Sequence, residues 1–192
     1  MATLSQVGIP GVGFGILMPK LKNKWRVMFQ GIGDGSGLSS DLSMQAVTVT
    51  RPNLTFEQVK LDRYNSTAYV AGKHEWEPCN IVVQDDITGL ASSIIQSQLE
   101  MQQELIGASG PFLATAATAS AYKFGMKLDQ LDGNETVVEE WLLEGCWIAG
   151  SDYGELDYGA SEVVTISLQI RFDHARQVIV QNGLGTAIGG TL

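Results

Sequence analysis

The sequence predicts a mainly β fold of the α+β kind: an antiparallel β-sandwich or barrel against which one α-helix packs. Two observations lead to this fold class. Most patterned segments alternate apolar and polar residues, which is typical of strands with one buried face. Only the segment from Leu90 to Leu105 repeats its apolar residues at helical spacing, and strand patterns precede and follow it. The length of 192 residues fits one domain with terminal arms.

The amino-terminal part of the chain combines an arm with several short strand patterns. Residues 1–19 are rich in glycine and carry no periodic pattern, so we expect an arm there. Strands follow, and turn-forming residues separate them. The expected strands are Trp25–Gln30, Leu42–Thr50, the weaker pair Phe56–Leu61 and Ala68–Ala71, and Trp76–Asp85.

The predicted helix comes directly after these strands. Asp85, Asp86 and Thr88 are expected to cap it and to place acidic groups in its first turn. A metal-binding role for the two aspartates is the less favoured alternative. Gly107 and the following Gly-Pro pair end the helical pattern.

Three further strands are expected in the carboxyl-terminal part. They are Tyr122–Leu128, Val137–Ile148 and Val164–Phe172. The last of these alternates most regularly, so one face is predicted to be core and the other polar. Residues 177–192 are again rich in glycine and are expected to form a second arm.

Charge is distributed unevenly along the chain, whose net charge is −9. Residues 1–80 hold eight Lys/Arg against six Asp/Glu, and residues 81–192 hold four against fifteen. No Lys or Arg occurs between Leu128 and Ile170, a stretch with ten acidic residues. Such a distribution favours head-to-tail self-association, although local cancellation of charge on the folded surface explains it equally well. Tight binding of nucleic acid is disfavoured, because it requires clustered cations.

The sequence contains no constellation typical of an enzyme. His74 and His174 lie far apart and outside any triad-like or zinc-binding context, and no phosphate-binding loop occurs. Cys79 and Cys146 lie in apolar strand patterns and are expected to be buried, reduced thiols. We therefore expect neither catalysis nor a metal or cofactor. Without a signal peptide or membrane span, synthesis and folding in the cytoplasm are expected.

Several segments in their order resemble the tail tube protein of contractile-tailed bacteriophages, a family related to the tubes of type VI secretion and of R-type bacteriocins. The resemblance runs from Lys20 to Arg176, so residues 20–176 are expected to form the tail-tube β domain between the two arms. The segments that carry it are KLKNKWRVMF, VTRPNLTFEQVKL, AGKHEWEPCNIVVQDDITG, YKFGMKLDQLDG, VVEEWLLEGCWIAGSDYGELDYG and EVVTISLQIRFDHA.

The resemblance implies a structural virion protein of the tail, assembled in the host cytoplasm. Such proteins form hexameric rings that stack head to tail inside a sheath, and their strands join a 24-stranded barrel through which DNA is ejected into the host. The implied partners are further copies of the chain, the tail sheath, baseplate and tail terminator proteins, and DNA that passes without specific binding.

Two alternatives remain at this stage. One is the tube of a phage-derived injection machine, a bacteriocin or secretion system, without DNA cargo. The other is a β-sandwich carbohydrate-binding module that uses Trp76, Trp141 or Trp147 as a stacking platform, although core packing is the commoner role of such residues.

Within the tail-tube interpretation, two sets of residues are candidates for function. Glu139, Glu140 and Glu144 are expected to lie at or near the lumen, where carboxylates would repel the phosphate backbone of DNA. Contact with basic residues of the adjacent ring is the equal alternative for these three side chains. The segment from Thr48 to Thr67 is expected to form a long loop or hairpin that reaches the next ring. Its cations, Arg51, Lys60 and Arg63, are the predicted positive half of the ring-stacking contact.

Overall fold

The computed structural model describes residues 20–33, 39–103, 122–132, 136–159 and 161–179 of the chain. The predicted amino-terminal arm and most of the predicted carboxyl-terminal arm lie outside these residues. The elements are β1 (Trp25–Gln30), α1 (Ser39–Met44), β2 (Ala46–Val49), β3 (Leu54–Arg63), β4 (Ser66–Trp76), β5 (Cys79–Gln84), α2 (Leu90–Gln103), β6 (Phe124–Leu131), β7 (Val137–Asp152), β8 (Thr165–Arg171) and β9 (His174–Ile179). All the strand pairings among them are antiparallel, which confirms the predicted mainly β class.

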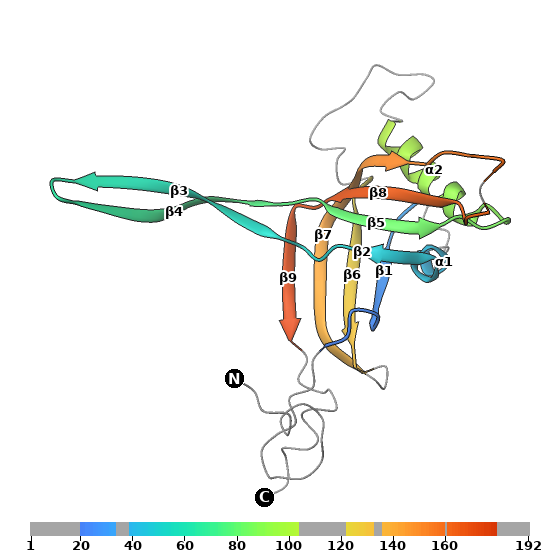
Figure 1. The fold of residues 1–192 in the computed structure, drawn as a ribbon, viewed down its shortest axis with the longest axis horizontal. Helices are drawn as coiled ribbons and strands as arrows, with labels where there is room; N and C mark the ends of the chain where they lie inside the picture. Colours follow the sequence, from blue (N-terminus) through green and yellow to red (C-terminus); the bar gives the residue numbers. More distant parts are fainter. Residues whose placement is uncertain (1–19, 34–38, 104–121, 133–135, 160, 180–192) are drawn as a thin grey trace, which may run out of the picture.

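The body of the molecule consists of two layers that share one strand. Strands β1, β6, β7 and β9 lie side by side in the first layer, and β8, β5 and β2 cross them in the second (Figure 1). The 16-residue strand β7 belongs to both layers, because Glu139–Glu144 pair with β9 and Trp147–Asp152 pair with β8. Gly145 lies where β7 changes layer and has a φ of 68°. A Cβ atom there would collide with the Asp173 carboxylate, so glycine is required.

The core lies between the two layers. The alternating strand β8 contributes Ile166, Leu168 and Ile170, which are all at most 2% exposed. Strand β5 contributes Ile81 and Val83 at 0% exposure. The alternation of Val164–Phe172 in the sequence therefore predicted the buried face of β8 correctly.

Helix α2 covers one end of this core. Its buried residues include Ile94, Ile95 and the fully buried Gln98, whose amide links separate parts of the chain. Gln98 Oε1 accepts a hydrogen bond from the Gly33 amide at 2.9 Å, and Gln98 Nε2 donates to the Tyr122 carbonyl at 2.6 Å. Neither helix in the described ranges is long and apolar enough to cross a membrane.

The predicted cap of α2 is wrong. The helix begins at Leu90, directly after Gly89, and no acidic residue lies in its first turn. Asp86 instead closes the preceding turn, in which its carbonyl accepts from the Gly89 amide and its carboxylate accepts from the Thr88 hydroxyl. Asp86 thus stabilises the turn that precedes helix α2 rather than the first turn of the helix.

The first half of the predicted strand Leu42–Thr50 is helical, so the fold has a second helix. Helix α1 ends at Met44, and the run of β-branched residues that forms β2 starts only after it. Leu42 is fully buried while Met44 is 78% exposed, so this turn of helix delivers the Leu42 side chain to the core. A strand through Leu42 was predicted because the segment is rich in β-branched residues, and these lie in its second part, which forms β2.

Two other strand predictions had the wrong extent. The predicted strand Trp76–Asp85 is divided, since Trp76 ends β4 and β5 starts at Cys79. Pro78 lies between them and has no backbone N–H to contribute to a ladder. The short candidates Phe56–Leu61 and Ala68–Ala71 are parts of one long hairpin, β3–β4.

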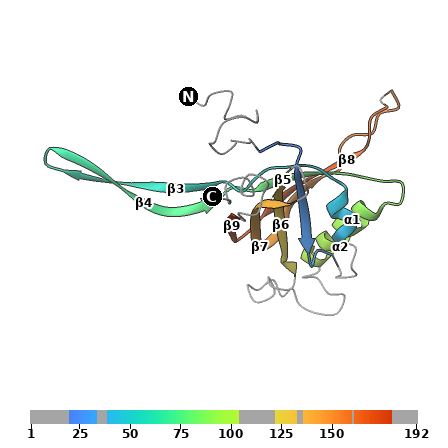
Figure 2. The same ribbon diagram turned by 90° about the horizontal axis from the view of Figure 1, so that it is seen from below.

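This hairpin and one loop mark opposite ends of the molecule. The hairpin β3–β4 forms a two-stranded sheet of its own that projects far from the body (Figures 1 and 2). The segment between β7 and β8, residues 153–159 and 161–164, lies at the other end in both views. The molecule is therefore elongated and has two dissimilar ends.

Candidate assembly surfaces

The first layer of the body has two free edges. Its strands run in the order β1, β6, β7, β9, and within the described part of the chain neither β1 nor β9 has a partner on its outer side. Each strand is antiparallel to its neighbour, so β1 and β9 run in opposite directions. An edge of this kind can pair with another strand through its unpaired backbone groups. Copies of the chain placed edge to edge would continue an antiparallel sheet.

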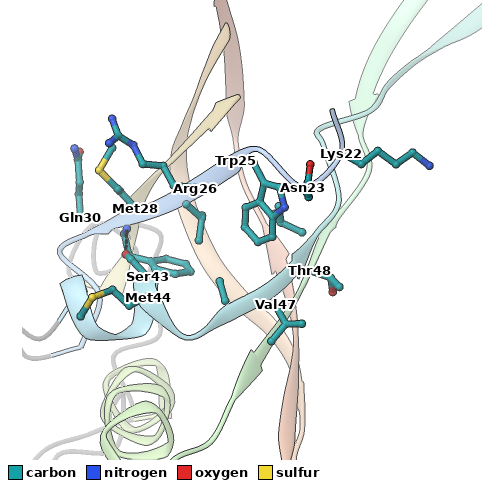
Figure 3. A pocket seen from close by; sticks show the side chains of 14 residues that line it. Lys22, Asn23, Trp25, Arg26, Met28, Gln30, Ser43, Met44, Val47 and Thr48 are labelled. Carbon is teal, nitrogen blue, oxygen red and sulfur yellow. Dashed lines mark hydrogen bonds between the residues drawn. The ribbon is translucent and has the colours of Figure 1, made fainter. Parts of the chain in front are cut away.

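A groove runs beside the free edge of β1 and separates it from the free edge of β2 (Figure 3). Its walls are largely apolar and include Trp25, Met28, Met44 and Val47. Met44 is 78% exposed and Val47 is 43% exposed, which is unusual for side chains of this type beside a core. The groove gives an incoming strand both free backbone groups and apolar contacts.

The face of the first layer that points away from the core carries a lattice of charges. Arg26 Nε donates to Asp129 Oδ2 at 2.8 Å, and Lys127 Nζ lies 2.7 Å from Glu140 Oε2 and 3.6 Å from Asp129 Oδ1. The hydrogen bond to Glu140 raises the pKa of Lys127. Arg176 of β9 lies on the same face, because its register partner Leu142 is also the partner of Lys127.

Two of the three predicted lumen residues lie on this face. Glu140 belongs to the lattice, and Glu144 is an exposed residue of β7 opposite His174. The described part of the face therefore carries three carboxylates, those of Asp129, Glu140 and Glu144, against the cations of Arg26, Lys127 and Arg176. The face is balanced in charge, in contrast to the acidic surface that the sequence led us to expect.

The structure separates Glu139 from the other two glutamates. The side chain of Glu139 lies on the opposite side of β7, and the residue is only 4% exposed. Lys20 Nζ forms a short ion pair with its carboxylate, which also accepts from Trp141 Nε1 at 2.7 Å and Gln177 Nε2 at 2.8 Å. Burial raises the pKa of Glu139, but these three bonds outweigh burial and hold the pKa below its ordinary value of 4.5. Glu139 thus links β7 to Gln177 of β9 and to Lys20, the first described residue.

The three predicted stacking cations are not brought together. Lys60 and Arg63 lie in the outer half of the hairpin, on strand β3. Arg51 lies before β3, at the root of the hairpin, where it lines a recess with Glu139 and Trp141. Lys60 Nζ is paired with Asp62 at 3.0 Å, whereas neither Arg51 nor Arg63 has an ion pair within the described residues.

The two faces of the outer hairpin differ in chemistry. Register pairs Val59 with Val70, Leu61 with Ala68 and Arg63 with Ser66 on one face. Val59, Leu61 and Val70 are 44%, 44% and 51% exposed, so this face is an uncovered apolar surface that ends in a cation. The opposite face carries the neutralised Lys60–Asp62 pair. Soluble monomers seldom leave an apolar strand surface uncovered in this way.

Trp76, Trp141 and the two cysteines belong to the interior of the protein, whereas Trp147 is partly exposed on β7 and does not pack against the core cluster. Trp76 and Trp141 pack against the core, and the ring of Trp76 lies 5.6 Å from that of Phe172. Cys79 and Cys146 are free and fully buried, as predicted, and burial raises their pKa values to about 11 and about 12. At neutral pH both thiols are therefore protonated and unreactive.

Sequence reasoning missed β9 and the groove beside β1. Strand β9 runs through residues 177–179, which the sequence assigned to an arm, and it contributes the small residue Ala175 to the core. The only sequence signal for β9 was the spacing of Ala175 and Gln177, whose side chains contact the core and Glu139 respectively. The groove could not be predicted, because it is formed by two strands that are not paired with each other.

Comparison with known proteins gives matches at the level of structure. No protein-family model matches the sequence, and no curated protein matches it either. A chain of the anti-feeding prophage (AFP) tube-terminating cap has a TM-score of 0.63 at 9% sequence identity, and the match covers 91% of this chain and 100% of that chain.

Two other structures extend the same likeness. A chain of the sheath–tube complex of the extracellular contractile injection system PVC, in its extended state, has a TM-score of 0.57 at 11% identity and covers 94% of this chain and 100% of that chain. A chain of the AFP baseplate has a TM-score of 0.52 at 14% identity and covers 85% and 98%. The tail-tube fold expected from the sequence is confirmed: the chain has the fold of tube and cap proteins of contractile injection systems.

Proposed function

We propose that this chain is the structural subunit of an inner tail tube and assembles into hexameric rings that stack head to tail. The observation that carries this proposal is the four-stranded layer β1-β6-β7-β9 with its two free, oppositely directed edges. When β9 of one copy pairs with β1 of the next, six copies of four strands give a closed 24-stranded barrel without free edges. The groove beside β1 receives the incoming edge.

In this ring the charged face of the first layer lines the lumen. The core and the second layer cover its other side, so only this face is available to the channel. Glu140 and Glu144 would then be lumen residues, as expected. Glu139 was assigned to the same surface, but its three bonds within the chain support a structural role for it, that of holding β9 in place.

Ring stacking is assigned to the hairpin β3–β4. It carries the predicted cations Lys60 and Arg63, with Arg51 at its root, and it projects far from the body (Figure 2). Reversal of charge in Arg51→Glu/Arg63→Glu should leave rings that do not polymerise. Tubes of normal length from this double variant would contradict the assignment.

Two cargoes fit a tube of this kind. The first is DNA, ejected from a phage tail into a host through a lumen that does not bind it specifically. The second is the protein cargo of a phage-derived injection machine. The balanced lattice around Arg26, Lys127 and Arg176 favours the second, because rings of inward cations retard a polyanion more than they retard a chain of mixed charge. In either case the expected partners are a sheath, a baseplate and a tube terminator, and the role is structural rather than catalytic.

The test of the proposal is the state of assembly of the purified chain. We expect native mass spectrometry to give a mass of six subunits and negative-stain electron microscopy to show hollow rings or tubes of uniform diameter. A monomer at every concentration, also after addition of a cognate baseplate, would contradict the proposal. A closed ring with a different number of copies would contradict the 24-stranded barrel but not the edge-to-edge pairing.

A further inference from the structure

The end of the molecule opposite to the hairpin carries a recess that the proposed function does not use. It is formed by the segment between β7 and β8 and is lined by Tyr153, Leu156, Tyr158 and Val163. Leu156 is 82% exposed, Tyr158 is 112% exposed and Val163 is 64% exposed. An apolar surface of this kind, on a loop that contributes nothing to the core, is typical of a docking site.

Carboxylates surround this recess. Asp152, Glu155, Asp157 and Glu162 lie in or beside the loop, and the sequence has no Lys or Arg between Leu128 and Ile170. Asp152 and Asp157 accept hydrogen bonds from the Gly154 and Gly159 amides and so shape the loop. Glu155 and Glu162 have no ion pair or hydrogen bond within the described part of the chain, so their charge is available to a partner. The recess therefore fits a surface that is apolar and basic.

The hairpin of a second copy presents such a surface. One of its faces exposes Val59, Leu61 and Val70 and ends in Arg63, which has no ion pair within the described residues. Hairpin and recess lie at opposite ends of the molecule, so one chain cannot bring its own hairpin onto its own recess (Figure 2). A contact between unlike ends is heterologous, and its repetition generates a filament wherever the rotation between copies does not close a ring.

We infer that the Arg63 face of the hairpin docks in the acidic recess of a copy in the next ring, with Arg63 against Glu155 and Glu162. This inference rests on the proposed tube function and deepens it, because it names the acceptor of the stacking contact. It also identifies the face of the hairpin that docks. The Lys60–Asp62 ion pair lies on the opposite face and points away from the interface.

A charge-swap experiment tests this contact. We expect Arg63→Glu to raise the protein concentration at which tubes form about tenfold, the effect of roughly one lost charged contact at an interface. Glu155→Arg/Glu162→Arg should do the same, and the combined triple variant should recover assembly. Lys73→Glu is the matched control, with the same change in charge at an exposed position of β4 in the inner half of the hairpin, and it should assemble like the unaltered protein. Failure of the triple variant to recover, or an equal defect in Lys73→Glu, would overturn the inference.

Photo-crosslinking gives a readout that does not depend on polymer length. Benzoylphenylalanine replaces Tyr64, which is 101% exposed at the hairpin tip, in an equal mixture of isotopically light and heavy chains. Digestion at acidic residues is needed, because trypsin has no site between Leu128 and Ile170. Mixed-isotope crosslinks to residues 153–164 are expected. Crosslinks to other surfaces, or no crosslinks, would overturn the contact. If this crosslink forms but no rings of six subunits are found, the hexamer is overturned and the contact is retained.

Discussion

The body and the hairpin β3–β4 are built from similar strands but depend on different partners. In the body, apolar side chains such as those of Ile81 and Leu168 are paired on the neighbouring strands β5 and β8 and are at most 2% exposed. In the hairpin, Val59 and Val70 face each other in the same way, yet they remain 44% and 51% exposed. The body is therefore stabilised within one chain, whereas the apolar surface of the hairpin is left uncovered by the chain that carries it. Strand formation alone does not say which chain completes the packing.

The largest effect that separates the two regions is expected from Ile81→Ala. This change leaves a cavity at a fully buried position of β5 and should lower the free energy of unfolding by about 2–5 kcal/mol. Chemical denaturation of the unassembled subunit measures it. The matched control is Gln84→Ala, at an exposed position of the same strand. An equal loss in both variants would mean that β5 does not form the core as described.

A smaller effect is expected where the body depends on a buried polar side chain. Gln98→Leu leaves the Gly33 amide and the Tyr122 carbonyl without their partner and should cost roughly 1–3 kcal/mol of stability. Gln96→Leu, on the exposed side of the same helix, should cost much less. Thermal unfolding of both variants compares them directly. Comparable losses would show that helix propensity, rather than the buried network, explains the result.

The contribution of Glu139 to the body is expected to depend on pH. Its pKa is lower in the folded state than in the unfolded state, so its stabilising contribution is complete above the ordinary value of 4.5. That contribution is lost as the pH falls from there through the folded-state pKa. Unfolding measured from about pH 6 to pH 3 should show a weaker pH dependence in Glu139→Gln than in the unaltered chain. Identical pH profiles would exclude this role, and Glu144→Gln on the opposite face is the control.

The smallest effect on stability is expected in the hairpin. Val59→Ser/Val70→Ser removes apolar surface that is already exposed and should change the unfolding free energy of the subunit by less than about 0.5 kcal/mol. The same variant should fail to form tubes, because it removes the apolar surface offered to the neighbouring copy. Sedimentation and unfolding measured on one preparation separate the two effects. A destabilised monomer would break the comparison, since it would place the hairpin in the same cooperative unit as the body.

The sequence predicted those elements whose pattern is explained by burial within one chain. Strand β8 and helix α2 were identified because their apolar residues face a core in the same molecule. A long loop or hairpin was expected over Thr48–Thr67, but its strands were predicted only as two short fragments, because their apolar residues do not face such a core. Strand β9 was missed because Ala175, which it contributes to the core, is small, and because Gln177 contacts Glu139 through a polar amide.

The candidate surfaces were predicted less well than the fold, and for a different reason. The sequence gives the number of acidic residues but not the cations placed across from them. Asp129 and Glu140 belong to the stretch without Lys or Arg, for which local cancellation of charge was left open, and Arg26 and Lys127 reach them from neighbouring strands. Arg26 and Asp129 are 103 residues apart in the chain, and only the register of β1 against β6 brings them together.

The passage of β7 from one layer to the other has a mechanical consequence. A force applied along the second layer is transmitted to the first layer through the covalent backbone of β7 around Gly145. This transmission does not require side-chain packing between the layers. The layers therefore cannot slide past each other without stretching a single continuous strand. A wall built from such subunits would resist shear between its inner and outer surfaces. It would move as a rigid body when it is pushed from one end.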